Sequence, residues 1–354
     1  MKAVRPETKT RTSNHEGEIM SNSSAPLRWG LVSTANINRA MIDPIRRADR
    51  SQLIAVSSRG LGKARAYAEE WSIPKAFGSY EEMLADPEID VVYISLPNTL
   101  HSEWTVKAAD AGKHVVCEKP IVPTLSELDL IEAAAARNAV AVFEAFMYLH
   151  HPQTLTVQRM VSEGRVGRLQ LIRSWFSFYL PAEQSTNIRL NPALSGGSLW
   201  DVGVYPNSMA ITIAGRPPAE VWAQQIVGET GVDVTMVGQM RFADDISAQI
   251  TSSFRMPFTE GTVIVGDEGT ITIPHPWKPG MNDAPSEIIF EPRQGEVEAI
   301  AIEGIDPYRC QVRAMEACVL DGAKPVVPLS RSRDFLRSVL ALYESAKTGR
   351  VVAL

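Results

Sequence analysis

The chain has 354 residues, of which 45% are hydrophobic and 21% are charged; this predicts about two globular domains and excludes a disordered or fibrous protein. The 35 basic and 41 acidic residues leave a formal net charge of −6, which argues against a nucleic-acid partner because polyanion binding needs a basic surface. The three cysteines form no C-x-x-C pair, so we expect neither a disulfide framework nor a metal site.

The amino-terminal 25 residues are polar and show no hydrophobic periodicity. Such a segment buries too little apolar surface to offset the entropy of ordering, so residues 1–25 are predicted to be a disordered tail. Met20 precedes the first apolar run, and one hypothesis is that translation begins there. Because no apolar run reaches about 18 residues and no signal-peptide core is present, we expect no membrane partner and a cytoplasmic location.

From Leu27 onward, short apolar runs alternate with longer amphipathic stretches. Strands rich in Val and Ile that are separated by single helices predict a parallel sheet covered on both faces. Residues 26–148 are therefore predicted to form a doubly wound, dinucleotide-binding Rossmann domain. The predicted strands are 27–33, 51–58, 75–78, 90–97, 113–120 and 139–147, with helices near 37–48, 61–71, 80–86, 100–111 and 124–138.

Residues 149–354 show a different hydrophobic pattern, in which apolar segments are separated only by short turn sequences, as antiparallel strands are. We predict an α+β domain for substrate binding and oligomerisation, with a mostly antiparallel open sheet. An open sheet face commonly pairs with its own copy, so a homodimer or homotetramer is expected. The predicted strands are 169–180, 220–228, 233–243, 246–255 and 261–274, and helices near 309–321 and 331–347 return to pack on one of the domains.

The turn after the first strand departs from the glycine-rich dinucleotide fingerprint, which would place glycine at positions 33, 35 and 38. Ala at the middle position still permits close backbone approach, and the first hydroxyl could donate to a phosphate. The alternative is an ordinary strand-to-helix loop. The candidate pyrophosphate-binding residues are Ser33, Thr34, Ala35, Asn36 and Ile37.

The second strand ends at Ser58 and Arg59, about 20 residues beyond the turn, where the ribose-reading residue is expected. No carboxylate stands there. Hydroxyls and a guanidinium suit a 2′-phosphate, so NADP is favoured over NAD as the cofactor. The alternative is a solvated polar loop that caps the next helix.

The fourth and fifth strands end in the segments Pro-Asn-Thr-Leu-His and Cys-Glu-Lys-Pro. Ligands of open α/β sheets bind beyond the carboxyl ends of the strands, so these segments would surround the nicotinamide end of a cleft. The histidine also suits a packing role. The candidate residues here are Leu96, Pro97, Asn98, His101, Glu118 and Lys119.

Three motifs in this order, D-V-V-Y-I-S-L-P-N-T-L-H, A-G-K-H-V-V-C-E-K-P and E-A-F-M-Y-L-H-H-P-Q, resemble the signatures of the Gfo/Idh/MocA oxidoreductase family. The resemblance extends from about Leu27 to the carboxyl terminus. Within the family, the chain is similar to the branch of trans-dihydrodiol dehydrogenases and NADP-dependent D-xylose dehydrogenases.

The resemblance implies a glycine-rich turn in the second domain, followed by an acidic residue and, four residues later, a histidine or tyrosine. Asp201 and Tyr205 occupy those positions after Gly196 and Gly197, and on a helix they share one face. The alternative is a capped helix whose tyrosine packs in the core. Arg189 also fits the branch pattern, as a contact to substrate or to the lid of the cleft.

Together with these residues, the resemblance implies an NAD(P)-dependent dehydrogenase that acts on a hydroxyl of a sugar, D-xylose for example. Tyr205 would exchange the substrate proton, while the Lys119 ammonium would favour its phenolate and Asp201 would orient a neighbouring hydroxyl. A trans-dihydrodiol dehydrogenase or an NADPH-dependent sugar-ketone reductase is the nearest alternative. An NAD-dependent glycosidase and a non-catalytic nucleotide-sensing regulator are alternatives of another class.

Overall fold

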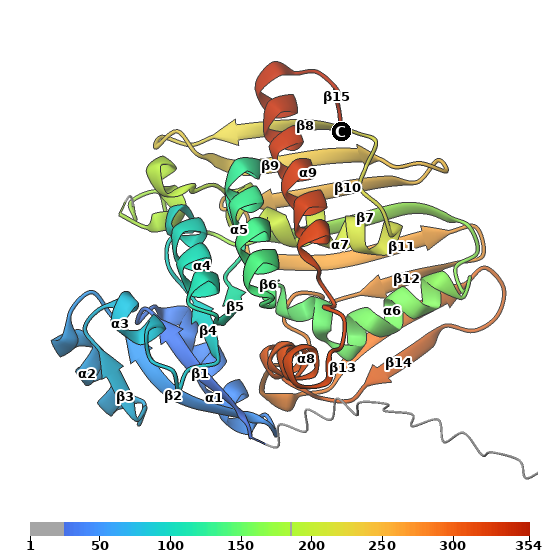
Figure 1. Cartoon of the computed structure of the whole chain (residues 1–354). Helices are drawn as coiled ribbons and strands as arrows, with labels where there is room; N and C mark the ends of the chain where they lie inside the picture. Colours follow the sequence, from blue (N-terminus) through green and yellow to red (C-terminus); the bar gives the residue numbers. More distant parts are fainter. Residues whose placement is uncertain (1–24, 185) are drawn as a thin grey trace, which may run out of the picture.

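The computed structural model describes residues 25–184 and 186–354. The hypothesis about Met20, and all of the predicted tail before Ala25, lie outside the described residues. Two sheets organise the described chain, one with six strands and one with nine (Figure 1). The predicted fold class, a Rossmann-type parallel sheet followed by an α+β part, is confirmed.

The six-stranded sheet is parallel throughout and has the order β3-β2-β1-β4-β5-β6. All four residues of β4 are buried, as expected for a central strand with helices on both faces. The strand order reverses between β1 and β4, which makes the edge beyond their carboxyl ends the expected ligand crevice. The strands are Leu27–Val32, Ser51–Ser57, Lys75–Phe77, Val91–Ile94, His114–Cys117 and Val142–Glu144.

Five helices connect these strands, each close to its predicted range. The longest, α5, begins at the N-cap residue Thr124, whose hydroxyl accepts from the Glu127 amide and donates to the Glu127 carboxylate. The helices α1 to α5 are Arg39–Arg47, Leu61–Glu70, Tyr80–Leu84, His101–Asp110 and Leu125–Asn138.

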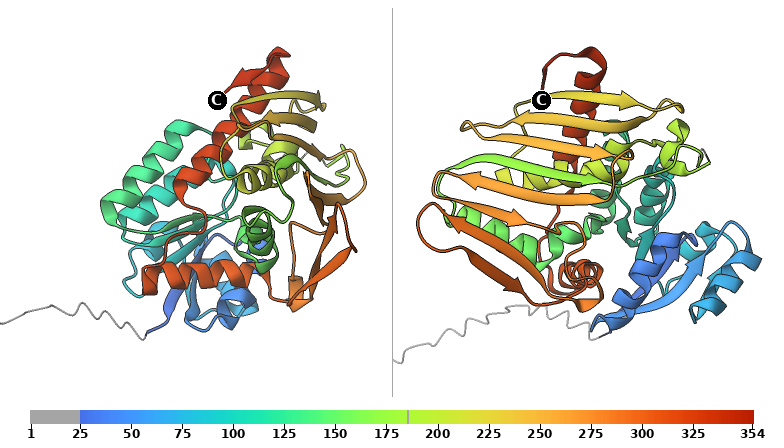
Figure 2. Two further views of the ribbon diagram at one scale, coloured as in Figure 1. Left: turned by 90° about the vertical axis from the view of Figure 1, so that its right-hand side faces the viewer. Right: turned by 180° about the vertical axis from the view of Figure 1, so that it is seen from behind.

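The nine-stranded sheet has the order β14-β13-β12-β11-β7-β10-β9-β8-β15 and is antiparallel except where β7 pairs with β10. Helices cover one of its faces, and the view from behind in Figure 2 shows the other face without helices. The strands β7 to β15 are Leu169–Ser177, Glu220–Val227, Asp233–Arg241, Ser247–Ser253, Thr259–Gly266, Gly269–Ile273, Ser286–Pro292, Glu298–Ile302 and Val352–Ala353.

Several elements of this second part were not predicted. The single strand expected over 261–274 is a hairpin, β11 and β12, because a turn at Asp267 and Glu268 reverses the chain. Strands β13, β14 and β15 were missed, as was helix α6 (Pro152–Ser162), which begins with proline directly after the paired histidines. Helix α7 spans Val204–Ala214.

The last two helices, α8 (Pro307–Asp321) and α9 (Leu329–Thr348), contact both halves of the molecule instead of packing on one. Helix α9 packs against β8 and α7 and also against α5. Helix α8 lies against α1, and its buried Glu316 accepts hydrogen bonds from the Arg50 amide at 2.9 Å and the Ser51 hydroxyl at 2.7 Å. The Ser51 hydroxyl in turn accepts from the Trp29 indole at 3.0 Å. This chain of bonds attaches α8 to the start of β1 and β2.

None of the helices in the described ranges is both long and apolar enough to cross a membrane.

Candidate functional site

A cavity of about 760 Å³ lies beyond the carboxyl ends of β1, β2 and β4. This volume is within the range of sites that hold small molecules and cofactors, and the cavity lies at the crevice that the strand order predicts. Asn36 and Ile37 come directly after Ala35 in a short 3₁₀ turn and do not line the cavity. The predicted cofactor residues that do line it are Ser33, Thr34, Ala35, Ser58, Arg59, Leu96 and Pro97.

The residues that replace glycine in the first turn make hydrogen bonds of their own. Ser33 keeps the backbone conformation of a glycine at this position, since its φ of 101° is one that glycine adopts most easily. The Asn38 amide is fully buried, donates to the Ser33 carbonyl at 2.8 Å, and accepts from the Ser95 hydroxyl at 2.6 Å. The Ser33 hydroxyl bonds with that of Ser95 at 2.8 Å and accepts from the Ala35 amide. It therefore has partners inside the protein, and its donation to a phosphate stays a prediction.

Positive charge gathers on one wall of this cavity. Arg59 and Ser58 follow β2, as predicted, and Lys63 joins them from the first turn of α2. The Lys63 side chain was missed in the sequence. Its place in the first turn of the helix that directly follows Arg59 is the signal that would have found it.

His101 connects two strand ends and does not line the cavity. It is fully buried, and its ring nitrogens lie 2.8 Å from the carbonyl oxygens of Leu96 and Pro120. Burial lowers the pKa of the imidazole, and the ring serves as a link between the segments that carry Asn98 and Lys119.

Glu118 is held away from the cavity, where its carboxylate accepts from the Tyr93 hydroxyl at 2.5 Å. Burial raises the pKa of Glu118. Glu144, at the end of β6, accepts from the Ile121 amide at 3.0 Å and so supports the segment that carries Lys119. Burial raises the pKa of Glu144 to about 7.

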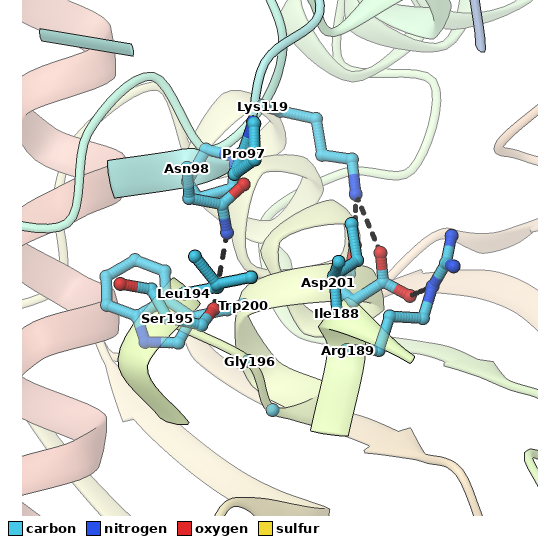
Figure 3. Close-up of a pocket in the computed structure, with 12 residues that line it drawn as sticks. Pro97, Asn98, Lys119, Ile188, Arg189, Leu194, Ser195, Gly196, Trp200 and Asp201 are labelled. Atoms are coloured by element: carbon cyan, nitrogen blue, oxygen red, sulfur yellow. Dashed lines mark hydrogen bonds and ion pairs between the residues drawn. The ribbon is translucent and has the colours of Figure 1, made fainter. Parts of the chain in front are cut away.

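A second, much smaller cavity of about 60 Å³ separates the Rossmann strand ends from residues 188–201 (Figure 3). Asn98 and Lys119 face it from one side, and Arg189 and Asp201 from the other. The Asn98 side-chain amide donates to the Ser195 carbonyl at 3.2 Å. The segment 188–197 thus covers the strand ends, and the space beneath it is too small for a sugar.

Asp201 is the electrostatic centre of this cavity. The Lys119 ammonium lies 3.3 Å from its Oδ1 atom and 2.5 Å from its backbone oxygen, and the Arg189 Nε atom lies 2.6 Å from Oδ2. Burial alone would raise the pKa of Asp201, but the charges of Lys119 and Arg189 outweigh it and lower the pKa below its usual value. The carboxylate is therefore ionised at neutral pH.

Asp201 and Tyr205 do not lie on one regular α-helix as predicted. Asp201 belongs to a π-helical turn, Leu199–Gly203, and Tyr205 belongs to the first turn of α7. Such turns occur often at functional sites. Lys119 nevertheless meets both residues, because its ammonium lies 5.1 Å from the centre of the Tyr205 ring.

The Tyr205 ring is 8% exposed. Burial raises its pKa well above 10, and the neighbouring Tyr308 and Glu118 add to the effect. The expected lowering of the Tyr205 pKa by Lys119 is absent from this arrangement, since the ammonium bonds to Asp201. Four aromatic rings surround Tyr205 at centroid distances of 5.6 to 5.9 Å, from Phe146, Tyr148, Phe176 and Trp277.

Trp277 comes from the connection between β12 and β13, where no sequence pattern indicated a role. Within the described residues, no group of three or more His, Cys, Asp or Glu side chains could hold a metal ion.

Comparison with protein-family models gives two matches. Residues 27–146 match the model described as the oxidoreductase family with an NAD-binding Rossmann fold, and residues 154–272 match the GFO/IDH/MocA C-terminal domain. Together they cover more than half of the chain and confirm the resemblance inferred from the motifs.

Among the curated relatives are two whose names describe a dehydrogenase. A D-xylose 1-dehydrogenase (NADP(+)) from Haloferax volcanii is 34% identical, with 93% of this chain and 100% of the relative covered. A trans-1,2-dihydrobenzene-1,2-diol dehydrogenase from Danio rerio is also 34% identical, over 72% of this chain and 76% of the relative.

Two solved structures have the same fold as this chain. An aldose-aldose oxidoreductase from Caulobacter crescentus superposes with a TM-score of 0.85 at 23% identity, covering 93% of this chain and 100% of that one. A 3-ketoreductase from Actinomadura kijaniata, solved with NADP and TDP-benzene, gives a TM-score of 0.81 at 26% identity, covering 92% and 98%.

The lowered pKa of Asp201 predicts a pH effect on stability. A carboxyl whose pKa is lower in the folded than in the unfolded chain stabilises the fold above its unfolded pKa of about 3.9, and this contribution is lost as the pH falls through the folded pKa. Asp201→Asn should therefore lose less stability than the unaltered chain between about pH 5 and pH 2. Urea denaturation midpoints at both pH values test this, and an identical loss in both proteins would contradict it.

Proposed function

The chain belongs to the GFO/IDH/MocA oxidoreductase family, and we propose that it transfers a hydride between NADP and a ring hydroxyl of a sugar, with D-xylose as the first substrate to test. The observation that carries the proposal is the meeting of Lys119, Asp201 and Tyr205 between the two sheets. The name of the 34% identical relative from Haloferax volcanii supports both the sugar and the cofactor.

The residues around the larger cavity fit NADP. Its volume of about 760 Å³ is sufficient for the adenosine and phosphate portion. The turn 33–35 would hold the pyrophosphate through backbone amides, while Ser58, Arg59 and Lys63 would hold a 2′-phosphate. When bound, the cofactor supplies the carbon that accepts or donates the hydride.

The chain's own residues would handle the proton. In oxidation, the substrate hydroxyl must lose its proton as the hydride leaves, and Tyr205 would accept that proton in its phenolate form; in reduction, the protonated phenol would donate the proton back. Lys119 would hydrogen-bond the reacting oxygen, and Asp201 would orient a neighbouring hydroxyl. Substrate would compete with Arg189 for the Asp201 carboxylate, so segment 188–197 has to move for a sugar to enter.

We also propose a division of the chain into units of 26–148 and 149–354, which falls between β6 and α6. A cytoplasmic location and the absence of nucleic-acid and membrane partners remain predictions from composition.

Tyr205→Phe should lower the turnover of sugar oxidation by about 10²-fold or more and leave NADPH binding nearly unchanged, because only the exchangeable proton is removed. Since burial raises the pKa of Tyr205, the oxidation rate of the unaltered enzyme should still be rising at pH 9. Turnover profiles from pH 6 to 10 and NADPH fluorescence titration check both points. Unchanged turnover in the variant would reject the assignment of Tyr205.

The cofactor and the substrate class are tested together by following reduced nicotinamide over a panel of sugars and diols with NADP⁺ and NAD⁺. We expect kcat/KM to be highest for NADP⁺ with an aldopentose. Arg59→Ala should lower kcat/KM for NADP⁺ by about 10- to 100-fold, the worth of one charge-assisted hydrogen bond, and spare NAD⁺. Arg65→Ala, on the helix that follows Arg59 and outside the cavity, is the control. Preference for a diol would support the dihydrodiol alternative, and sugar turnover without net NADPH would indicate a glycosidase.

The uncovered face of the nine-stranded sheet supports the proposal of a homodimer. A row of cross-strand neighbours runs over this face and carries a single charge, on Arg173. Exposed apolar side chains, Trp222 at 37% and Val237 at 41%, lie on the same face. The row consists of Trp222, Gln239, Gln249, Arg173, Val263, Thr272, Ile289 and Ala299.

Sedimentation at micromolar concentration should therefore show a dimer, or a tetramer built from dimers. Thr251→Glu places a charge beside Trp175 and Val237 on this face and should shift the protein toward monomer, because like charges would face each other. Ala66→Glu, exposed on α2, is the control. A monomer in the unaltered protein would count against the proposal.

A further inference from the structure

A third cavity, of about 560 Å³, lies apart from the two already described. It is bounded by the start of α6, by residues 274–285 between β12 and β13, and by the adjoining ends of β13 and β14. Its size falls within the range of small-molecule sites. Nothing in the proposed reaction uses it.

Two polar groups of this cavity have unused hydrogen-bonding capacity. Gln153 is 1% exposed, and its Nε2 atom donates to the His275 carbonyl at 3.1 Å. That bond fixes the amide, so the free atom is the acceptor Oε1, which has no partner among the described residues. The Ser286 hydroxyl, also buried, has none there either. Such groups are costly to leave unsatisfied, and a ligand that bears hydroxyls or amides would satisfy them.

The charges around the cavity indicate a neutral ligand. Lys278 and Glu287 contribute one charge of each sign. The His275 ring turns to the Glu260 carboxylate at 2.9 Å. A single lining carboxylate is too few for a cation site, and a single ammonium opposed by a carboxylate does not favour an anion. The remaining walls are aliphatic, from Pro274, Pro279, Met281, Ala284, Pro285 and Ala301.

We propose that this cavity is a second binding site for a neutral polyhydroxylated molecule, of the sugar or polyol class. Its hydroxyls would donate to Gln153 and exchange hydrogen bonds with Ser286, while its C–H face would lie on the prolines. The choice of class rests in part on the proposed function, since the same class of molecule is the proposed substrate.

The site is placed to influence catalysis through the segment that forms its wall. Trp277 lies in that segment, is fully buried, and packs against Tyr205 at 5.7 Å between ring centres. Gly280 in the same segment has a φ of 70°, and a side chain there would meet the Ile305 carbonyl at 2.1 Å. The segment is thus packed tightly, and a ligand beside it contacts the backbone that holds Trp277 against Tyr205.

The test is equilibrium dialysis of ¹⁴C-labelled D-xylose against enzyme saturated with NADPH, with absorbance of the reduced nicotinamide followed to confirm that no turnover occurs. Ala301→Trp fills the cavity from an exposed lining position. Ala299→Trp is the matched control, because it is exposed on the same face of the same strand, within the row proposed as the dimer contact, and does not line the cavity. Sedimentation of both variants shows whether either change alters the oligomeric state. Thermal unfolding of both variants verifies that they fold.

We expect two equivalents of D-xylose per chain in the unaltered enzyme and in Ala299→Trp, and one in Ala301→Trp. One equivalent in the unaltered enzyme and none in Ala301→Trp would support the second site and refute D-xylose as the active-site ligand. Equal binding in all three proteins, or equal loss in both variants, would overturn the second site. Hydrogen exchange should show protection of residues 274–285 by D-xylose in the control and not in Ala301→Trp.

Discussion

The Asp201 carboxylate, placed between two cations from different parts of the chain, is the constraint on which the site depends. Lys119 reaches it from the Rossmann sheet at 3.3 Å, and Arg189 reaches it from the covering segment at 2.6 Å. Because Lys119 and Asp201 are largely removed from water, their ion pair is stronger than one on the surface would be, whereas Arg189 remains exposed to solvent. The three side chains hold one another in place, and they also hold the segment 188–197 over the strand ends. The residues proposed for catalysis are thus the same ones that keep the site closed.

In this arrangement, the distance of Tyr205 from Lys119 does not determine the pKa of its phenol. Lys119 is close to the ring, but its charge does not make the phenol acidic, because the effect of burial on the pKa is larger. Burial among four aromatic rings raises the pKa of Tyr205. A protonated phenol suits the donation of a proton to a carbonyl oxygen. Oxidation requires a substrate that draws Lys119 and Asp201 into new hydrogen bonds.

Much of the fold could be predicted from the sequence, because buried parallel strands read as runs of Val and Ile. The strand ends then placed Asn98, Lys119 and the residues after β2 at one crevice without further information. The pairing of Asp201 with Tyr205 came from family resemblance, and spacing alone did not reveal the π-helical turn between them. That turn depends on backbone hydrogen bonding, which leaves no periodic signal in side chains.

Contacts that depend on tertiary packing could not be predicted. Ser33 and Asn38 looked like losses from a glycine motif, but they bond to each other and to Ser95, a residue from a distant strand. Trp277 lies in a long connection with neither strand nor helix periodicity, and only the folded chain brings it to Tyr205. Strands β13 and β14 escaped prediction because their alternation of apolar and polar residues is short and irregular.

The attachment of α8 to the first two strands has a consequence for the order of events during synthesis. Trp29 and Ser51 emerge from the ribosome well before their partner Glu316, which follows Ser51 by 265 residues. The nucleotide-binding half therefore stays incomplete, with polar groups at the start of its central strands unpaired, until helix α8 has been translated. Domains are generally expected to fold from the amino terminus onward, but here the first half to appear reaches its final form only when α8 has followed it.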